Sequence, residues 1–222
     1  ELLEGKTPQI EPSPSYRLHV EDEEKYLHSK IHDRDVDYWK RILKDVTPPV
    51  SLKEEQGADV SPVGYRRTFY LTEIMNHELN AFCTSHRIAP FAVFYMAVAI
   101  YLKRTRGIRS FCMGAPVHNR SSYTDRKTTG MFVSTLPFSS SIDESWSFEE
   151  FAGHLEEDWL ELLRHQKLSY GEIFAICKSE NPSVHRLYHL VLSFHNSQAY
   201  KNHNTSVEFS GQWHYSGYQA EH

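Results

Sequence analysis

The sequence predicts an α/β fold in which helices pack on a mixed β-sheet. Segments with helical periodicity alternate with short apolar runs, and no internal repeat interrupts this alternation. Hydrophobic residues make up 40% of the 222 residues, enough to bury a sizeable core. The formal net charge of −5 arises from 24 basic and 29 acidic residues without a long basic run, which argues against a nucleic-acid-binding protein.

The N-terminal part of the chain predicts a connecting segment followed by two helices. Prolines at positions 8, 12 and 14 interrupt residues 1–30, in which a helical stretch is expected over residues 21–29. A second helix is predicted over residues 33–44 and is ended by two prolines. Apolar side chains at helical spacing predict its buried face, namely Val36, Trp39, Ile42 and Leu43.

The middle of the chain predicts one strand and two helices. Residues 64–71 are rich in aromatic side chains, which favours a strand. Thr72 suits the N-cap of a helix that runs to about residue 86. The following helix, residues 91–103, begins after Pro90 and is apolar on all sides, so we expect it to be central.

The last part of the chain predicts further strands and two capped helices. Short buried strands are expected over residues 110–114 and 131–138. Capping-box patterns, Ser147 with Glu150 and Ser169 with Glu172, mark helices that end near residue 165 and span residues 171–178. Apolar and polar residues alternate over residues 187–195, which predicts a strand, and residues 205–218 predict a final hairpin.

The motifs of several enzyme classes are missing from the sequence. It contains no GxGxxG and no GxxxxGK[ST], so nucleotide binding is not indicated, and no GxSxG of the α/β-hydrolases. Histidines stand four residues apart at His28 and His32, and again at His185 and His189. Neither pair is followed by a third ligand, which favours surface histidines over a metal site.

The cysteines and the apolar segments indicate the cellular compartment of the protein and whether it spans a membrane. Cys83, Cys112 and Cys177 are odd in number and far apart, which indicates reduced core thiols in a cytoplasmic protein. The longest apolar stretch, residues 89–102, is too short to span a bilayer, and the first residues lack a signal-peptide pattern. We therefore expect no membrane partner.

Three polar sites leave structural and functional interpretations open. Asn119 and Arg120 follow a buried strand, where an arginine is either an ordinary loop residue or a functional group at a strand end. His165 with Gln166 closes a helix, where a histidine either complements the helix dipole or lines a ligand channel. The same ambiguity applies to residues 194–196 at the end of a predicted strand.

Five motifs, in the same order, resemble those of the condensation domains of nonribosomal peptide synthetases. Asp37-Tyr38-Trp39 resembles the family's D-x-YW helix, and residues 90–107 resemble its central helix. Residues 114–120, GAPVHNR, resemble its G-x-P-V-x-x-R strand and turn. Residues 129–135, TGMFVST, are similar to its G-x-F-V-N-T motif, and residues 165–170 to the start of its H-Q-D-x-P-F-E motif.

The chain also departs from the family pattern. Ser134 stands where the family usually has Asn, and Lys167, Ser169 and Tyr170 replace the usual Asp, Pro and Phe. The active-site motif HHxxxDG does not occur in the sequence, so we predict no catalytic residue within it. In the family this motif closes the first half of the domain. We therefore interpret residues 1–30 as the linker from an N-terminal lobe plus a first helical stretch, and residues 31–222 as a C-terminal lobe that stops before its natural end.

The resemblance implies a chloramphenicol-acetyltransferase-like lobe and a role in amide-bond formation. Two such lobes enclose a tunnel that the phosphopantetheine arms of a donor and an acceptor peptidyl carrier protein enter from opposite ends. The acceptor amine attacks the donor thioester, and no cofactor is bound directly. The implied partners are the N-terminal lobe, the two carrier proteins and an adjacent adenylation domain, in a pathway that makes an antibiotic or a siderophore.

The resemblance also assigns roles to particular residues. Arg120 is expected to pair with the aspartate of the missing motif and hold the two lobes in register. His165 and Gln166 are expected near a carrier-protein entrance. Residues of the strand near position 131 and of the 194–196 segment are expected to line the tunnel, together with the turn: Asn119, Met131, Phe132, Ser134, Thr135, Phe194 and Asn196.

Without the reactive histidine, the chain is expected to be inactive by itself. Two alternatives share the fold. One is a non-catalytic, condensation-like docking domain that has lost the histidine motif, and the other is a lobe of an epimerization domain, which acts on the α-carbon of a carrier-bound residue.

Overall fold

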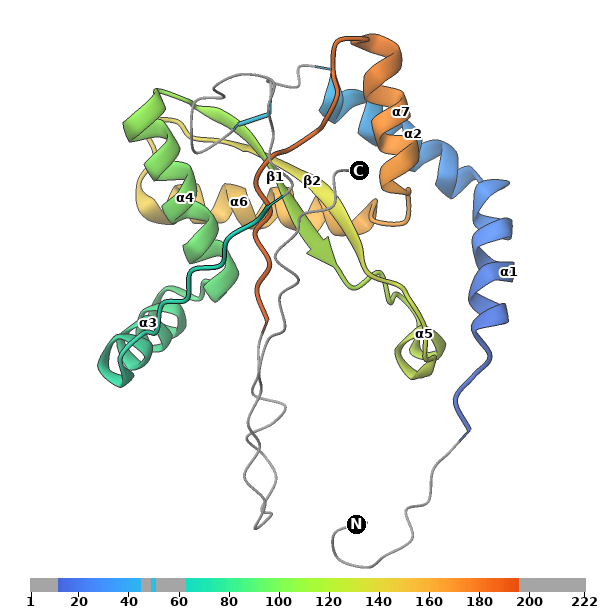
Figure 1. Cartoon of the computed structure of the whole chain (residues 1–222), viewed down its shortest axis with the longest axis horizontal. Coiled ribbons are helices and arrows are strands. Elements are labelled where there is room, and N and C mark those ends of the chain that lie inside the picture. Colours follow the sequence, from blue (N-terminus) through green and yellow to red (C-terminus); the bar gives the residue numbers. More distant parts are fainter. Residues whose placement is uncertain (1–11, 45–48, 51–62, 196–222) are drawn as a thin grey trace, which may run out of the picture. The chain divides into compact units, whose positions relative to one another are not determined.

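The computed structural model describes residues 12–44, 49–50 and 63–195, and the chain divides into two compact units. Unit 1 comprises Glu1–Val50, Ser110–Ser141 and Glu156–Val191, and unit 2 comprises Ser51–Arg109, Ile142–Leu155 and Leu192–His222. The described residues form helices and a small β-sheet, so the predicted mixture of helices and sheet is confirmed (Figure 1).

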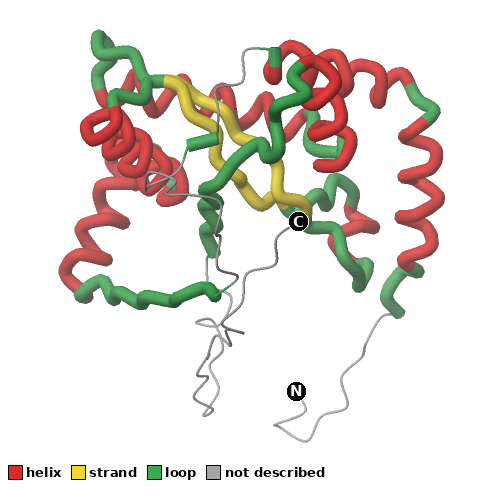
Figure 2. The backbone as a smooth tube through the Cα atoms, turned by 45° about the horizontal axis from the view of Figure 1, so that its top comes forward, coloured by secondary structure: helices red, strands yellow, loops and turns green. Residues whose placement is uncertain are grey.

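An antiparallel pair of strands forms the sheet of unit 1. Strand β1 (Ser110–Val117) pairs with β2 (Ser134–Ser141) in a register that runs from Ser110 opposite Ser141 to Val117 opposite Ser134 (Figure 2, yellow). Five consecutive residues of β1, from Phe111 to Ala115, are buried, as expected for a strand covered on both faces. Apolar runs predict both strands, although β2 begins three residues later than expected.

The predicted strand over residues 187–195 is wrong as an assignment of secondary structure. The backbone touches β1 at one isolated parallel bridge between Gly114 and Val191, where the Gly114 amide donates to the Leu190 carbonyl at 2.7 Å. Over residues 188–193 the alternation reports burial correctly, because Tyr188, Leu190 and Leu192 are partly buried while the residues between them are exposed. It fails at both ends, where Leu187 is buried and Phe194 is exposed. A strand requires a ladder of hydrogen bonds, and a one-sided burial pattern does not supply it.

Two helices with serine caps open unit 1. Helix α1 (Tyr16–Leu27) starts five residues before the expected position because the Ser15 hydroxyl accepts from the Arg17 amide. Helix α2 (Lys30–Leu43) is capped by Ser29. The predicted residues Trp39 and Leu43 are buried on α2, and its buried face also includes Asp35 and Tyr38, which the apolar pattern does not indicate.

Both capping boxes predicted from the sequence are present. At the start of α6 (Phe148–Arg164), the Ser147 and Glu150 side chains each accept from the other residue's backbone amide. Ser169 and Glu172 do the same at α7 (Tyr170–Glu180), which contacts α2. A third box, Ser122 with Asp125, caps the short helix α5 (Tyr123–Lys127).

Helices α3 (Glu73–His86) and α4 (Pro90–Arg106) are the main elements of unit 2. Thr72 caps α3 as predicted, and Gly107 ends α4 at φ 69°, a conformation that glycine adopts without strain. Helix α4 buries Tyr95, Met96, Ala99 and Leu102. The expectation that it is covered on all sides is wrong for the described residues, because Phe94, Ile100 and Tyr101 are exposed.

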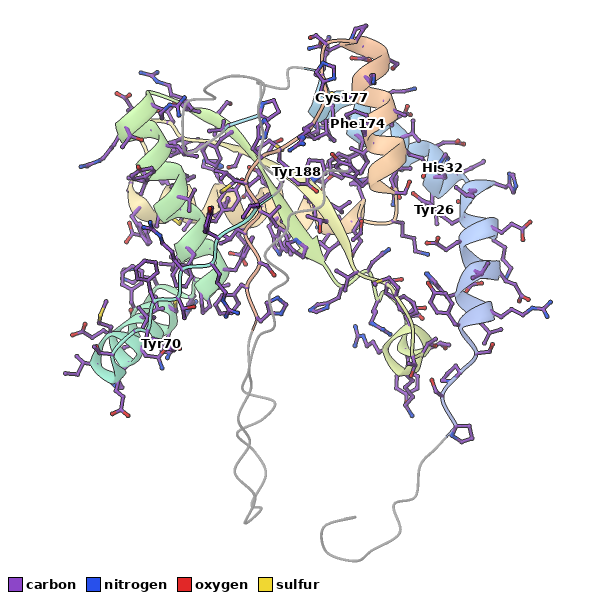
Figure 3. All side chains as sticks on the ribbon, viewed as in Figure 1. Tyr26, His32, Tyr70, Phe174, Cys177 and Tyr188 are labelled. Atoms are coloured by element: carbon purple, nitrogen blue, oxygen red, sulfur yellow. The ribbon has the colours of Figure 1, made fainter. Side chains whose placement is uncertain are left out.

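The predicted strand over residues 64–71 is also wrong. These residues carry no strand, and the aromatic side chains of Tyr65, Phe69 and Tyr70 are 86–89% exposed (Tyr70 is labelled in Figure 3). Aromatic residues favour strands because they fit a half-buried pleated surface, and here no such surface covers them. The predicted hairpin at 205–218 lies outside the described residues.

No single helix in the described ranges is long and apolar enough to cross a membrane, although α3 and α4, which meet at 98°, pass that test of length and composition as a bent pair.

Candidate functional site

An open groove of about 210 Å³ lies within unit 1 and gathers side chains from three parts of the chain. Helix α1 forms one side, the residues that lead into β2 form another, and the connection from α6 to α7 forms the third. The lining combines apolar, amide, hydroxyl and charged groups: Tyr16, His19, Glu23, Tyr26, Leu27, Asn119, Met131, Phe132, Val133, Ser134, Gln166, Lys167, Leu168, Ser169 and Glu172.

Aromatic packing fixes α1 against the segment before β2. The Tyr16 hydroxyl donates to the Met131 carbonyl at 2.7 Å, and the Tyr16 ring meets the Phe132 ring edge to face. The His19 ring lies 4.3 Å from the Phe132 ring. Gly130 has to lack a Cβ atom, since one would overlap the Tyr16 ring. These contacts explain why residues 131–133 line the groove and do not continue β2.

Arg120 organises the loop that borders the groove. Its guanidinium donates to the backbone carbonyls of Asp125, Thr128 (2.7 Å) and Gly130 (3.1 Å), and it lies 3.9 Å from the centre of the Phe132 ring. The planar fork of arginine suits three acceptors at once. Within the described residues, the guanidinium thus holds the loop of residues 125–130 in unit 1.

Asn119, next to Arg120, combines two unusual features. Its backbone has φ 48°, a left-handed conformation that asparagine tolerates better than most residues. Its side-chain oxygen Oδ1 is buried and has no hydrogen-bond partner in the part of the chain that the structure describes. A buried acceptor without a donor costs about 1–3 kcal/mol, so this turn is held in place by its surroundings.

A buried polar cluster supports the groove behind the α6–α7 connection. Asp35 is 1% exposed and accepts from His165 Nδ1 and from the Tyr26 hydroxyl, both at 2.8 Å. The His165 ring stacks on Tyr38 at 4.0 Å, and the Trp39 indole donates to the His165 carbonyl at 3.1 Å. Burial and then the hydrogen bond to Asp35 raise the pKa of Tyr26, so its hydroxyl stays protonated and remains a donor.

A second His–carboxylate pair lies at the start of α7. His32 Nε2 donates to Glu172 Oε1 at 3.0 Å, and the Glu172 carboxylate also accepts from the hydroxyl of Ser169 at 2.8 Å. Figure 3 shows Tyr26 and His32 close together where α1 meets α2, and their rings are 5.4 Å apart. Partial burial opposes ionisation of Glu172, but the hydrogen bonds from His32 and Ser169 outweigh it and lower its pKa.

The groove brings together five of the residues selected from the sequence: Asn119, Met131, Phe132, Ser134 and Gln166. Thr135 is not among the lining residues, and its carbonyl accepts from the Tyr188 hydroxyl at 3.2 Å. His165 is buried in the polar cluster and is not among them either. Phe194 belongs to unit 2, where it contacts Phe94, and Asn196 lies outside the described residues.

Sequence reasoning misses several residues that build the site. Asp35 interrupts an apolar face, so a search for hydrophobic periodicity passes over it, although its spacing from Tyr38 and Trp39 places all three on one side of α2. The sequence indicates a surface histidine at His32 and only a cap at its partner Glu172. No group of three or more metal-ligating side chains forms within residues 12–44, 49–50 and 63–195.

Comparison with known proteins identifies the family. The family model described as "Condensation domain" matches residues 1–221. The chain belongs to the condensation-domain family. Among curated relatives from Bacillus subtilis strain 168, it is 29% identical over 194 residues to surfactin synthase subunit 1 and 25% identical over 207 residues to one of the plipastatin synthase subunits. These matches cover 87% and 90% of this chain but 5% and 8% of the relatives.

Solved condensation domains share the fold. The first condensation domain of the CDA synthetase superposes with a TM-score of 0.73 at 22% identity, over 86% of this chain and 41% of that one. A starter condensation domain of rhizomide synthetase, solved in complex with C8-CoA, gives a TM-score of 0.70 at 25% identity, over 86% and 43%. The chain thus spans less than half of the condensation domains it matches.

Proposed function

We propose that this chain is the C-terminal lobe of a peptide-bond-forming condensation domain in a nonribosomal peptide synthetase. One observation carries the proposal: five residues selected by resemblance to three of the family's motifs line a single groove. The family membership and the synthetase relatives support the same reaction class. Residues 1–30 then connect to an N-terminal lobe that contributes the HHxxxDG motif.

The groove has a lining that suits a substrate tethered to phosphopantetheine. Ser134 and Gln166 offer polar groups to the amides of such an arm, and Met131 and Val133 offer apolar surface that is 76% and 52% exposed. An aminoacyl or peptidyl thioester combines the same two kinds of chemistry. The groove therefore supports a role as one wall of the channel in which the acceptor amine attacks the donor thioester.

The remaining site residues receive roles in this arrangement. Arg120 holds the loop next to the groove, and in the complete domain we propose that it also faces the aspartate of the HHxxxDG motif. Gln166 lines the groove, and we place it, with His165 behind it, near the entrance used by a carrier protein. Three buried cysteines without a disulfide support a reducing, cytoplasmic compartment. We also propose an adjacent adenylation domain as a partner, as in the nonribosomal peptide synthetases that the chain resembles.

A reconstitution assay tests the proposal. The complete condensation domain, mixed with loaded donor and acceptor carrier proteins, is expected to form the dipeptidyl thioester, whereas the 222-residue chain alone is expected to form none. Product from the chain alone would show that the chemistry does not depend on an N-terminal lobe. Inversion of the α-carbon without condensation would assign the domain to epimerization, and recruitment of another enzyme without either reaction would assign it to docking.

A groove-filling variant sharpens the same test. Ser134→Trp places a large ring in the groove and is expected to raise KM for the loaded carriers about tenfold or more, the effect of losing about 1.4 kcal/mol of binding. The matched control is Ser141→Trp at the other end of β2, an exposed position outside the groove, which is expected to leave KM unchanged. Equal KM values for the two variants would remove the groove from the substrate channel.

A further inference from the structure

We propose that His32 and Asp35 of α2 are positioning residues that hold the segment 165–172. This segment supplies one wall of the groove through Gln166, Lys167, Leu168, Ser169 and Glu172. His32 and Asp35 stand three positions apart, so their side chains project from the same side of the helix. Asp35 binds His165 at one end of the wall, and His32 binds Glu172 at the other. The inference rests on the proposed function only in treating the groove as a substrate channel. The contacts of His32 and Asp35 with the wall do not depend on that function.

The Asp35 end of the wall is the rigid one. The side chains of Asp35 and His165 are 1% and 8% exposed, and a buried carboxylate that loses its partner is strongly unfavourable. The Trp39 indole adds a hydrogen bond to the His165 carbonyl, so α2 holds both the ring and the backbone of this residue. The residue that follows is Gln166, the first lining residue of the wall.

The His32 end of the wall is more accessible. The side chains of His32 and Glu172 are 19% and 39% exposed, and Glu172 also completes the capping box of α7. Lys167, between the two ends, places its ammonium group 5.5 Å from the centre of the Tyr26 ring. Four consecutive lining residues therefore lie between the Asp35–His165 and His32–Glu172 contacts, namely Gln166, Lys167, Leu168 and Ser169.

The two pairs place the imidazole and the carboxylate on opposite partners. This order specifies how the wall is aligned along α2. Helix α2 contributes an imidazole at position 32 and a carboxylate at position 35, and the wall contributes the complementary group in each case. A wall displaced along α2 from His32 towards Asp35 would bring the carboxylates of Glu172 and Asp35 together, and like charges repel. A displacement the other way would separate both pairs. The arrangement thus favours one placement of the wall and so one shape of the groove.

Variants of His32 test the inference in the complete condensation domain. His32→Ala removes the bond to Glu172, whereas His32→Gln retains an N–H donor of similar length. The matched control, His86→Ala, breaks another His–carboxylate pair, His86 Nδ1 with Glu149 Oε1 at 3.4 Å, which lies in unit 2 and does not line the groove. Hydrogen exchange of the amides of residues 166–172 and steady-state kinetics are measured for all three variants.

The expected result is a change confined to the wall. His32→Ala should accelerate exchange at residues 166–172 about tenfold and raise KM for the loaded carriers by a similar factor, with kcat within about twofold of wild type, because a charge-assisted hydrogen bond corresponds to about that factor. His32→Gln should restore both quantities, and His86→Ala should change neither.

Two results would overturn the inference. One is unchanged exchange at residues 166–172 in His32→Ala, and the other is faster exchange there together with unchanged KM in a domain that forms product. If the wild-type domain forms no product, the proposed function fails, and the exchange data still decide whether His32 fixes the wall.

Discussion

Helices α2 and α4 are placed in their units by different kinds of contact. The buried residues of α4 are Tyr95, Met96, Ala99 and Leu102, and none of them carries a charge. The buried face of α2 includes the carboxylate of Asp35 beside Tyr38, Trp39 and Leu43. Apolar burial stabilises a helix without fixing its register closely, whereas a buried carboxylate accepts only an arrangement that satisfies it.

The helix with the buried carboxylate, α2, is also the one that contacts the groove wall. Helix α2 supports the wall at residues 165–172 through two His–carboxylate pairs. Helix α4 buries only uncharged side chains, and its Lys103 pairs with the exposed carboxylate of Glu144 at 3.2 Å. If the groove binds a substrate as proposed, its wall has to lie in one place, and we infer that the polar cluster supplies this specificity at a cost in stability. Substitutions on the two helices should therefore differ in which replacements they tolerate.

The largest effect is expected for Asp35→Ala. The substitution leaves the His165 imidazole and the Tyr26 hydroxyl buried without their acceptor, and it should lower the free energy of unfolding by about 3–5 kcal/mol. Asp37→Ala, on the same helix but less buried, should change it by less than about 0.5 kcal/mol. Denaturant unfolding measures both, and similar values for the two variants would show that the buried cluster contributes nothing.

A somewhat smaller effect is expected on α4. Leu102→Ala creates a cavity at a fully buried position and should cost about 2–4 kcal/mol, whereas Leu102→Met, which conserves volume, should cost less than about 1.5 kcal/mol. Asp35→Asn also conserves volume, yet it should cost more than Leu102→Met because the charge is lost. If Asp35→Asn and Leu102→Met lower the free energy of unfolding equally, α2 does not depend on a buried charge more than α4 depends on apolar packing.

Glycine substitutions extend the contrast to the sheet. A Cβ atom at Gly114 would lie 2.5 Å from the Tyr188 ring, so Gly114→Ala forces a shift and should cost about 1–3 kcal/mol. Gly153 lies inside α6 with no atom within 4 Å of the same position, so Gly153→Ala should stabilise the protein by about 0.5–1 kcal/mol. Thermal unfolding distinguishes the two, since the midpoint should fall in the first variant and rise in the second. A rise in both would mean that Tyr188 moves aside without cost.

Local signals in the sequence predict local features of the structure. The Ser147–Glu150 and Ser169–Glu172 boxes and the Thr72 cap are formed because capping depends on residues three positions apart. The predictions of strands at 64–71 and 187–195 are wrong because a strand depends on a distant partner, which side-chain composition does not reveal.

The candidate site shows the same limit. Motif resemblance selects Asn119, Phe132 and Gln166, which line one groove although they come from three different motifs. It does not select Asp35 or His32, because their importance comes from partners more than 100 residues away. A residue whose role is to hold another residue carries no motif of its own, so packing has to be seen before it can be named.

The smallest expected effect concerns the dependence of stability on pH. The pKa of Glu172 lies below its ordinary value of 4.5 in the folded protein, so folding favours the ionised carboxylate. The contribution is therefore present above the pKa of the unfolded chain and is lost as the pH falls through the folded pKa. Because 39% of the Glu172 side chain is exposed, solvent screening keeps this contribution small.

Glu172→Gln removes the titrating group and keeps its shape, so its urea midpoint should fall less steeply than that of wild type between about pH 5 and about pH 3. Glu149→Gln supplies the comparison, because the Glu149 side chain in the pair with His86 is 65% exposed and screened by solvent. The pH slope then reports on the His32–Glu172 end of the wall separately from the Asp35 end. An unchanged slope in Glu172→Gln would show that His32 and Ser169 do not stabilise the ionised carboxylate, and that the wall is held from the Asp35 end alone.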